Sequence, residues 1–132
     1  MNFKKSYQFG KKQELIVLPI IREYFGDNTI KPTEDKFCRY DYTSEDVNYE
    51  LKSRTTPYSK YSTTMITQDK LSNSDKPIIL LFSFTDGLYM IEHNMALFES
   101  FETKPFQRAG GEWKEKIHIY IPIEELKLIK MY

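Results

Sequence analysis

The first hydrophobic pattern along the chain has helical spacing. Apolar residues recur three or four positions apart near the N-terminus: Leu15, Leu18, Ile21 and Phe25. Gly26 follows the last of them, and glycine is common immediately after a helix. Pro19 lies inside this stretch, where a proline costs a helix about 3 kcal/mol. The pattern therefore predicts a helix that either bends at Pro19 or begins near Leu18.

Two short strands are expected after this helix. Residues 37–42 are rich in aromatic side chains and favour β structure, and residues 46–54 alternate between apolar and polar side chains. The apolar face of the second strand would consist of Val47, Tyr49 and Leu51. Residues 43–45 have the length of a hairpin loop, so the two strands are expected to be antiparallel. Cys38, on the first strand, is expected to lie in the core.

The middle of the chain contains a continuous apolar run, residues 77–84, bounded by turn residues. Such a run suits a central strand that is covered on both faces. Asp86-Gly87 is a strong hairpin signal and predicts a partner strand over residues 88–93. Before the run, residues 55–62 are expected to form a loop and residues 63–71 to contain a short helix.

Further short elements are expected towards the C-terminus. Residues 94–101 suit a short helix, Gly110-Gly111 marks a turn, and residues 116–121 alternate as a strand. Pro122 suits the first turn of a last helix over residues 123–129. This order of helices and strands is typical of an α/β or α+β fold with a mixed sheet.

Length and composition narrow the possibilities. A chain of 132 residues, 40% hydrophobic and 15% aromatic, suits one domain over residues 1–132 with a real core. Nineteen basic and nineteen acidic residues give zero net charge, which excludes a generally basic coat for nucleic acid. A single cysteine excludes internal disulfides and fits a reducing compartment. No apolar run approaches 18 residues, so we expect no membrane span and a cytoplasmic, intracellular protein.

Candidate chemistry begins with Glu50-Leu51-Lys52 on the second predicted strand. Residues two apart on a strand share a face, with Cα atoms roughly 7 Å apart. The Glu50 carboxylate could hold a divalent metal, while the Lys52 ammonium positions a water or stabilises charge on a phosphate. The alternative is a polar strand face in water, with an ion pair that contributes under about 1 kcal/mol.

Two further acids are expected near this pair. The hairpin would place Asp41 nearly opposite Asn48 or Glu50, and two facing carboxylates repel unless a cation lies between them. Mg²⁺ suits that role because it prefers oxygen ligands. The alternative is that Asp41 ends its strand and caps the turn. Glu14 would lie on the buried stripe of a continuous first helix, and in solvent if that helix begins near Leu18.

Glu14 in a first helix, Asp41 ending a strand and Glu50-Leu51-Lys52 in the next strand together resemble the PD-(D/E)XK nuclease superfamily. The resemblance covers about residues 10–84, with Tyr40 where the family's name has proline. It implies a restriction-endonuclease-like core of order α-β-β-α-β, with a central mixed sheet flanked by helices. The small size is similar to that of minimal endonucleases and junction resolvases of DNA repair and recombination, which phages and viruses often carry.

The resemblance also implies a role for each of these residues. Asp41 and Glu50 would bind Mg²⁺, with Mn²⁺ able to substitute, and Glu14 would complete the metal site. Lys52 would orient the water that attacks a DNA phosphodiester. The implied activity is that of a Mg²⁺-dependent deoxyribonuclease acting as an endonuclease.

Residues 53–64 follow the Glu50-Leu51-Lys52 strand directly and contain cations, tyrosines and many hydroxyls. Such a segment could bind backbone phosphates and stack a splayed base. The alternative is a polar loop whose tyrosines pack on the domain. Gln68 and Lys70, which follow this segment, lie where relatives often carry further polar groups of the active site. The candidate DNA-binding residues are Arg54, Tyr58, Lys60, Tyr61, Gln68 and Lys70.

A second function stays open at this point. A non-catalytic nucleic-acid-binding or protein-interaction domain could have the same fold, since fold does not fix function. Asp41 and Glu50 distinguish the nuclease from the non-catalytic domain, because a nucleic-acid binder gains nothing from carboxylates that face phosphate. A nuclease that cuts both strands needs two active sites or two visits, so a homodimer is a further expectation.

Overall fold

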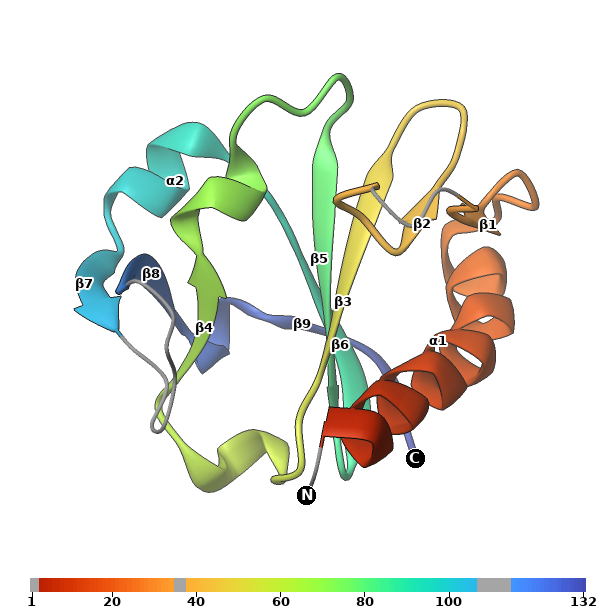
Figure 1. Cartoon of the computed structure of the whole chain (residues 1–132), viewed down its shortest axis with the longest axis horizontal. Helices are drawn as coiled ribbons and strands as arrows, with labels where there is room; N and C mark the ends of the chain where they lie inside the picture. Colours follow the sequence, from red (N-terminus) through yellow and green to blue (C-terminus); the bar gives the residue numbers. More distant parts are fainter. Residues whose placement is uncertain (1–2, 35–37, 107–114) are drawn as a thin grey trace.

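The chain folds into two β-sheets and two α-helices over the residues that the computed structural model describes, 3–34, 38–106 and 115–132. Figure 1 shows helix α1 (Phe3–Phe25) along one face of the larger sheet. The smaller sheet and helix α2 (Met95–Glu99) lie on the opposite side. The prediction of a mixed α+β fold with a mixed central sheet is confirmed.

The larger sheet has the strand order β1-β2-β3-β5-β6-β9. Its strands are β1 (Lys31–Pro32), β2 (Tyr42–Thr43), β3 (Asn48–Ser53), β5 (Ile78–Phe84), β6 (Gly87–Glu92) and β9 (Lys127–Met131). Only the β3–β5 pair is parallel, with Glu50 beside Leu80 in register, and the other neighbours are antiparallel. The smaller sheet is antiparallel in the order β4-β8-β7, formed by β4 (Thr63–Thr67), β8 (Lys116–Pro122) and β7 (Glu102–Phe106).

Strand β5 separates two hydrophobic cores, and all seven of its residues are buried. Because side chains alternate along a strand, Ile79 and Leu81 face α1 whereas Leu80 and Phe82 face the smaller sheet. The first core also contains Val17, Ile21, Tyr42, Tyr49 and Leu51. The second contains Ile66 of β4, Ile119 and Ile121 of β8, and Phe98 of α2. The continuous apolar run was correctly predicted to be a central strand covered on both faces.

Helix α1 is longer than predicted and continues through Pro19. Pro19 is exposed, so water can bind the backbone carbonyl that its missing N–H leaves without a helical partner. The buried stripe runs through Val17 and Ile21, which are both 0% exposed. Leu15 was predicted to be on that stripe but is 71% exposed, because it lies two positions before Val17 and faces away from the sheet. Gly26 closes the helix with a φ of 62°.

Two predicted elements are wrong, and a third is correct only in part. Residues 63–71, expected to contain a short helix, begin with strand β4 and end in a short 3-10 turn η2 (Gln68–Leu71). Burial alternates along β4, and its threonines and isoleucine favour a strand. Residues 123–129, also expected to be helical, form a 3-10 turn η3 (Ile123–Glu125) and begin the edge strand β9. Of the strand expected over 37–42, only residue 42 pairs, as part of β2, and residue 37 lies outside the described residues.

The short-range turn signals were more reliable. Residues 44–47 connect the antiparallel pair β2–β3, one position later than the predicted loop begins, and Thr85-Asp86 connects β5 to β6, which starts at Gly87. Asn94 caps α2 by accepting a hydrogen bond from the Leu97 backbone N–H at 3.0 Å. The strand predicted over 116–121 is β8, whereas the turn predicted at 110–111 lies outside the described residues.

The connection between the parallel strands β3 and β5 positions much of the site described next. It crosses the face opposite α1 and contains a 3-10 turn η1 (Tyr58–Lys60), β4 and η2 instead of the predicted helix. Among the described residues, no helix has the combination of length and hydropathy that crossing a membrane requires.

Candidate active site

Glu50 lies on β3, on the face that points away from α1. Its neighbours Tyr49 and Leu51 pack in the core beside the helix, so alternation directs Glu50 and Lys52 toward the smaller sheet. Glu50 is only 4% exposed. An ionisable side chain that is buried to this degree needs partners or a shifted pKa.

Two lysines flank one oxygen of the Glu50 carboxylate. Lys52 Nζ lies 3.5 Å and Lys70 Nζ 3.6 Å from Glu50 Oε1. The other oxygen, Oε2, is buried and has no hydrogen-bond partner. Burial and, to a smaller degree, the charge of Asp41 raise the Glu50 pKa to about 7, although both lysines act in the opposite direction. The site therefore contains a buried carboxylate oxygen that is available to a cation or a proton.

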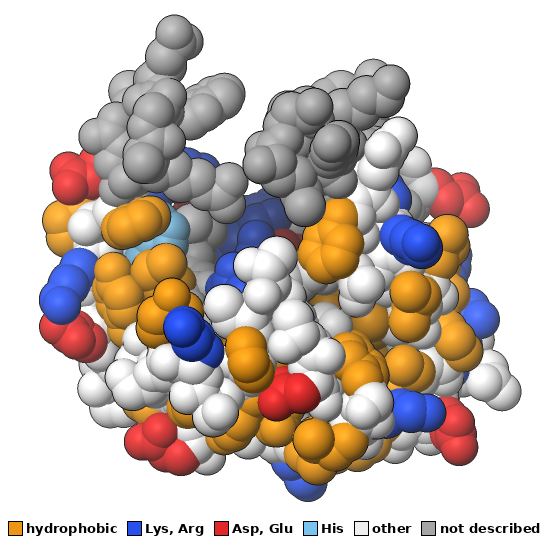
Figure 2. Space-filling view, turned by 90° about the horizontal axis from the view of Figure 1, so that it is seen from below, with side chains coloured by type: hydrophobic (Ala, Val, Ile, Leu, Met, Phe, Trp, Pro, Cys, Tyr) orange, Lys and Arg blue, Asp and Glu red, His pale blue; other side chains and the backbone are white. Residues whose placement is uncertain are grey.

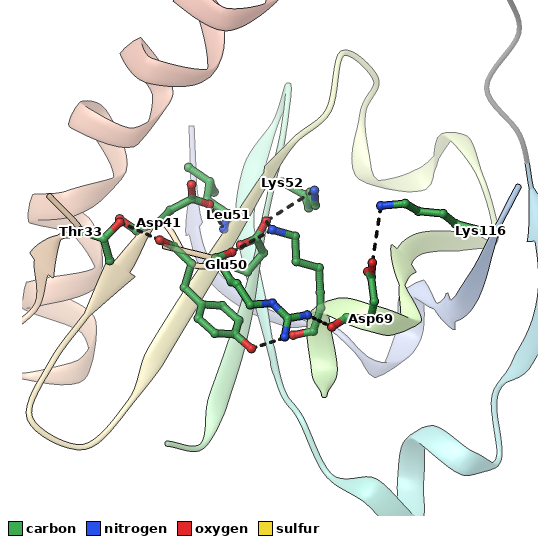
Figure 3. Close-up of polar contacts among 10 residues, drawn as sticks. Thr33, Asp41, Glu50, Leu51, Lys52, Asp69 and Lys116 are labelled. Atoms are coloured by element: carbon green, nitrogen blue, oxygen red, sulfur yellow. Dashed lines mark hydrogen bonds and ion pairs between the residues drawn. The ribbon is translucent and has the colours of Figure 1, made fainter. Parts of the chain in front are cut away.

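Asp41 lies immediately before β2, at the end of the β2–β3 ladder. The paired register of β2 and β3 ends at Tyr42–Tyr49, and Asp41 follows as the next residue outward, beside residues 49–51 of β3. Its backbone N–H donates to the Tyr49 carbonyl at 3.0 Å, and its Oδ2 accepts from the Leu51 N–H at 2.8 Å (Figure 3). The carboxylate thus binds the neighbouring strand rather than the 43–45 turn, and it acts on Glu50 electrostatically.

Glu14 approaches Asp41 from α1. Burial, followed by the charge of Asp41 and a hydrogen bond to it, raises the Glu14 pKa to about 7. Lys11 Nζ, one turn earlier on the helix, lies 3.4 Å from Glu14 Oε2. The Tyr42 hydroxyl donates to the Glu14 backbone carbonyl at 2.5 Å and fixes the helix to the strand. A continuous α1 therefore brings Glu14 to the site, and its side chain is 20% exposed rather than in open solvent.

Lys70 comes from η2, twenty residues after Glu50 along the chain. Its ammonium also donates to the Arg39 carbonyl at 2.8 Å, and its own carbonyl accepts from the Tyr40 hydroxyl at 2.8 Å. The Arg39 guanidinium donates in turn to the carbonyls of Asp69 and Ser72. Sequence reasoning assigned Lys70 to DNA binding and missed Arg39 altogether, since no local pattern signals contacts across about thirty residues.

Figure 2 shows basic side chains, with an acidic one among them, on one face of the molecule. The lysines of the site agree with such an arrangement, because Lys52 and Lys70 keep 31% and 29% of their side-chain surface exposed. A second lysine–carboxylate pair, Lys116 with Asp69 at 3.5 Å, lies across η2 and β8 (Figure 3). The side chains of Lys52 and Lys70 are thus partly exposed, whereas the Glu50 side chain is buried.

Another Glu-x-Lys sequence, on β7, shows how such a pair is arranged when both side chains are exposed to water. Glu102 and Lys104 on β7 form an ion pair at 2.9 Å, with side chains 61% and 57% exposed. No buried oxygen lacks a partner there, and water can solvate both charges. Glu50 and Lys52 share the motif but differ in burial and in neighbouring charges. The motif on β7 is therefore a matched control for experiments on the motif on β3.

The remaining DNA-binding candidates have different surroundings. Arg54 is fixed by hydrogen bonds to Thr64 Oγ1 at 3.2 Å and to the Met65 carbonyl at 2.7 Å. Lys60 and Tyr61 are exposed, and Tyr61 lines a groove beside β4. Gln68 lines a different hollow, next to α2. Cys38 was expected in the core but is exposed, because residues 38–41 lie outside the strands of the sheet.

Tyr58 has contacts that are typical of a core residue. Its ring stacks on Tyr89 with centroids 4.2 Å apart, meets Phe84 edge to face, and its hydroxyl donates to the Ile123 carbonyl at 2.9 Å. Tyr58 therefore fits the alternative in which the tyrosines of residues 53–64 pack on the domain.

We expect Tyr58→Ala to lower the free energy of unfolding by about 3 kcal/mol, because it removes a packed ring. Tyr58→Phe should cost about 1 kcal/mol through the lost hydroxyl contact. Urea unfolding measures both variants. A Tyr58→Ala protein of wild-type stability would contradict the packing role.

The donor set can be tested for its fit to a divalent cation. Within the described part of the chain, no three acidic, histidine or cysteine side chains converge closely enough to form a ready-made metal site. Mg²⁺ does not need such a cage, since it often uses one or two carboxylates together with waters and substrate phosphate. Glu50 Oε2 supplies one unpartnered oxygen, and Asp41 is a second carboxylate close enough to raise the Glu50 pKa. These residues therefore fit Mg²⁺ held jointly with a phosphate.

Comparison with known proteins gave no match: no family model, no curated protein and no solved structure is significantly similar to this chain.

Proposed function

We propose that this chain is a Mg²⁺-dependent nuclease of the PD-(D/E)XK type, which hydrolyses phosphodiester bonds of DNA. The observation that carries the proposal is the buried Glu50 carboxylate, with Oε2 unpartnered and Lys52 and Lys70 beside Oε1. A structural ion pair has no use for a desolvated, unpartnered oxygen, which is costly to bury. Perturbed acids of this kind are concentrated at functional sites.

The order of elements around Glu50 supports the same proposal. Helix α1, the antiparallel pair β2–β3 and the parallel strand β5 follow the order that we expect for a restriction-endonuclease-like core. The crossover departs from it, because β4 and η2 replace the helix between β3 and β5. We propose that the core is a reduced version in which the small sheet covers the face that a helix would cover.

In this proposal Asp41 and Glu50 hold Mg²⁺, with Glu14 as the third carboxylate. Bound metal would supply positive charge to the phosphate and would make water easier to deprotonate. In its absence the Glu14 carboxyl, whose pKa is raised to about 7, can hold a proton beside Asp41, which limits the repulsion between the two acids. The raised pKa values of Glu14 and Glu50 then reflect a site that is built for a cation.

The lysines would act directly on the reacting groups. Hydrolysis adds the oxygen of one water to phosphorus, breaks one phosphorus–oxygen ester bond, and transfers a proton to the departing sugar oxygen. Lys52, with its ammonium next to Glu50, would orient the attacking water or bind a non-bridging phosphate oxygen. Lys70 is fixed by the Arg39 carbonyl and would supply a second positive charge to the phosphate. A homodimer would provide the two sites needed to cut both strands at once.

The proposal is tested by incubating the purified protein with supercoiled, single-stranded and branched DNA. We expect cleavage with Mg²⁺ or Mn²⁺ and none with EDTA, as resolved by gel electrophoresis. Absence of cleavage with either metal on all three substrates would contradict a nuclease. If Asp41→Asn or Glu50→Gln then tightens DNA binding, the domain is a non-catalytic nucleic-acid binder.

A further inference from the structure

A groove of about 580 Å³ lies beside the candidate active site, between the segment that follows β3 and strands β4 and β8. Its volume is in the range of sites for small molecules. Both hydroxyl groups and apolar side chains line it, and none of the described residues that line it is acidic. The residues used in the argument below are Arg54, Tyr61, Thr63, Tyr120 and Ile123.

Strand β3 leads from the candidate site to Arg54, which lines the groove. Glu50, Lys52 and Arg54 occupy alternate positions and therefore project from the same face, in steps of roughly 7 Å. The backbone N–H of Arg54 donates to the Ser83 carbonyl at 2.7 Å, so the chain stays in register with β5 up to the groove. The Arg54 side chain then turns to β4 and lies over the Phe82 ring, with Cζ 5.6 Å from the centroid. A polymer whose phosphate is at Glu50 and Lys52 would reach the groove with its adjacent unit.

The lining suits a nucleobase. Tyr61 is 61% exposed at the edge of the groove and presents a ring on which a base can stack. Ile123 supplies apolar surface, and the Thr63 and Tyr120 hydroxyls can bind the polar edge of a base. The absence of carboxylates from the lining avoids repulsion of the phosphates on either side. A base that is paired inside a duplex cannot enter such a groove without leaving the stack.

We propose that this groove binds an unpaired nucleotide of the DNA strand, next to the phosphate held at Glu50 and Lys52. The substrate is then single-stranded DNA or a strand that is unpaired at the cleavage position. This inference rests on the proposed nuclease function for the position of the phosphate. The zero net charge of the chain is consistent with it, because binding through stacking needs fewer phosphate contacts than binding to a duplex backbone.

The test compares Tyr61→Ala with two controls, Tyr61→Phe, which keeps the ring, and Tyr24→Ala, which removes a partly exposed ring of α1. Fluorescence anisotropy in EDTA measures binding of a labelled twelve-nucleotide oligo(dT) strand and of a duplex of the same length. We expect Tyr61→Ala to weaken binding of the single strand by about fivefold to a hundredfold, the effect of losing one stacked base. Both controls should stay within twofold of wild type, and binding of the duplex should be unchanged for all variants.

Equal affinity of wild type and Tyr61→Ala for the single strand would overturn the inference, as would an equal loss for strand and duplex. Should Tyr61→Ala fail to fold, ultraviolet crosslinking of wild type to an oligonucleotide with 5-iododeoxyuridine, followed by peptide mass spectrometry, replaces it. Adducts in residues 54–64 support the groove, and adducts only elsewhere overturn it. Because neither measurement needs cleavage, a protein that binds in the groove but cuts no DNA contradicts the nuclease and leaves the groove standing. If wild type cleaves DNA but Tyr61→Ala does not change strand binding, the groove inference is contradicted and the nuclease proposal stands.

Discussion

Glu50→Gln should lower the rate of DNA cleavage with Mg²⁺ on the order of a thousandfold, with the fold intact. The substitution keeps the shape of the side chain but removes the negative charge that would hold the cation, and one electrostatic group at a reacting centre is worth about that factor. Glu50 supplies the buried oxygen Oε2, which has no hydrogen-bond partner, and no other described carboxylate has such an oxygen. Single-turnover cleavage of a labelled DNA strand measures the rate, and circular dichroism measures the fold.

Lys52→Met should cause a comparable loss, because it removes the ammonium that lies 3.5 Å from Glu50 while keeping most of the side-chain volume. The matched controls are Glu102→Gln and Lys104→Met, which alter an exposed pair with the same sequence spacing. Both controls should cleave within twofold of wild type. Wild-type-like rates for Glu50→Gln and Lys52→Met would remove this site from the chemistry. Equal losses for the controls would trace the effect to overall charge.

The acids of the site show what a local pattern can predict. Period-two alternation was enough to put Glu50 and Lys52 on one face, and hairpin length was enough to bring Asp41 beside the strand that carries Glu50. The position of Glu14 depended on whether α1 continues past Pro19, which the sequence left open. Each of these relations joins residues of one element or of neighbouring elements, where backbone geometry fixes the distance.

The parts that could not be predicted depend on contacts between distant segments. The Glu-x-Lys pattern also occurs on β7, and only tertiary packing buries Glu50 and leaves Glu102 in water. Lys70 reaches Glu50 because η2 folds back against Arg39 and Tyr40. Short apolar segments fit a helix or a strand equally well, and the sheets into which they pack decide between the two. For β4 and β9 that partner is β8 or β6, each far away in the sequence.

The stability of wild-type protein in EDTA should fall by about 3 kcal/mol between pH 4.5 and pH 7 through Glu50 alone. Its pKa rises from an ordinary 4.5 to about 7 on folding, so the native state holds the proton more tightly than the unfolded chain does. Unfolding then releases a proton across this range, and stability decreases as the pH rises. The contribution is fully present below pH 4.5 and is lost once the pH exceeds about 7.

Glu50→Gln removes this titration, so its stability relative to wild type should increase by about 3 kcal/mol from pH 4.5 to pH 8. At pH 8 the variant should be the more stable protein, because an amide is less costly to bury than an ionised carboxylate. Urea unfolding in EDTA at several pH values measures the difference, with Glu102→Gln as the exposed control that should follow wild type. Parallel curves for wild type and Glu50→Gln would show that Glu50 is not buried as a titrating acid. A stability gain for Glu50→Gln at pH 8 would indicate that Glu50 serves to bind a cation or a substrate rather than to stabilise the fold.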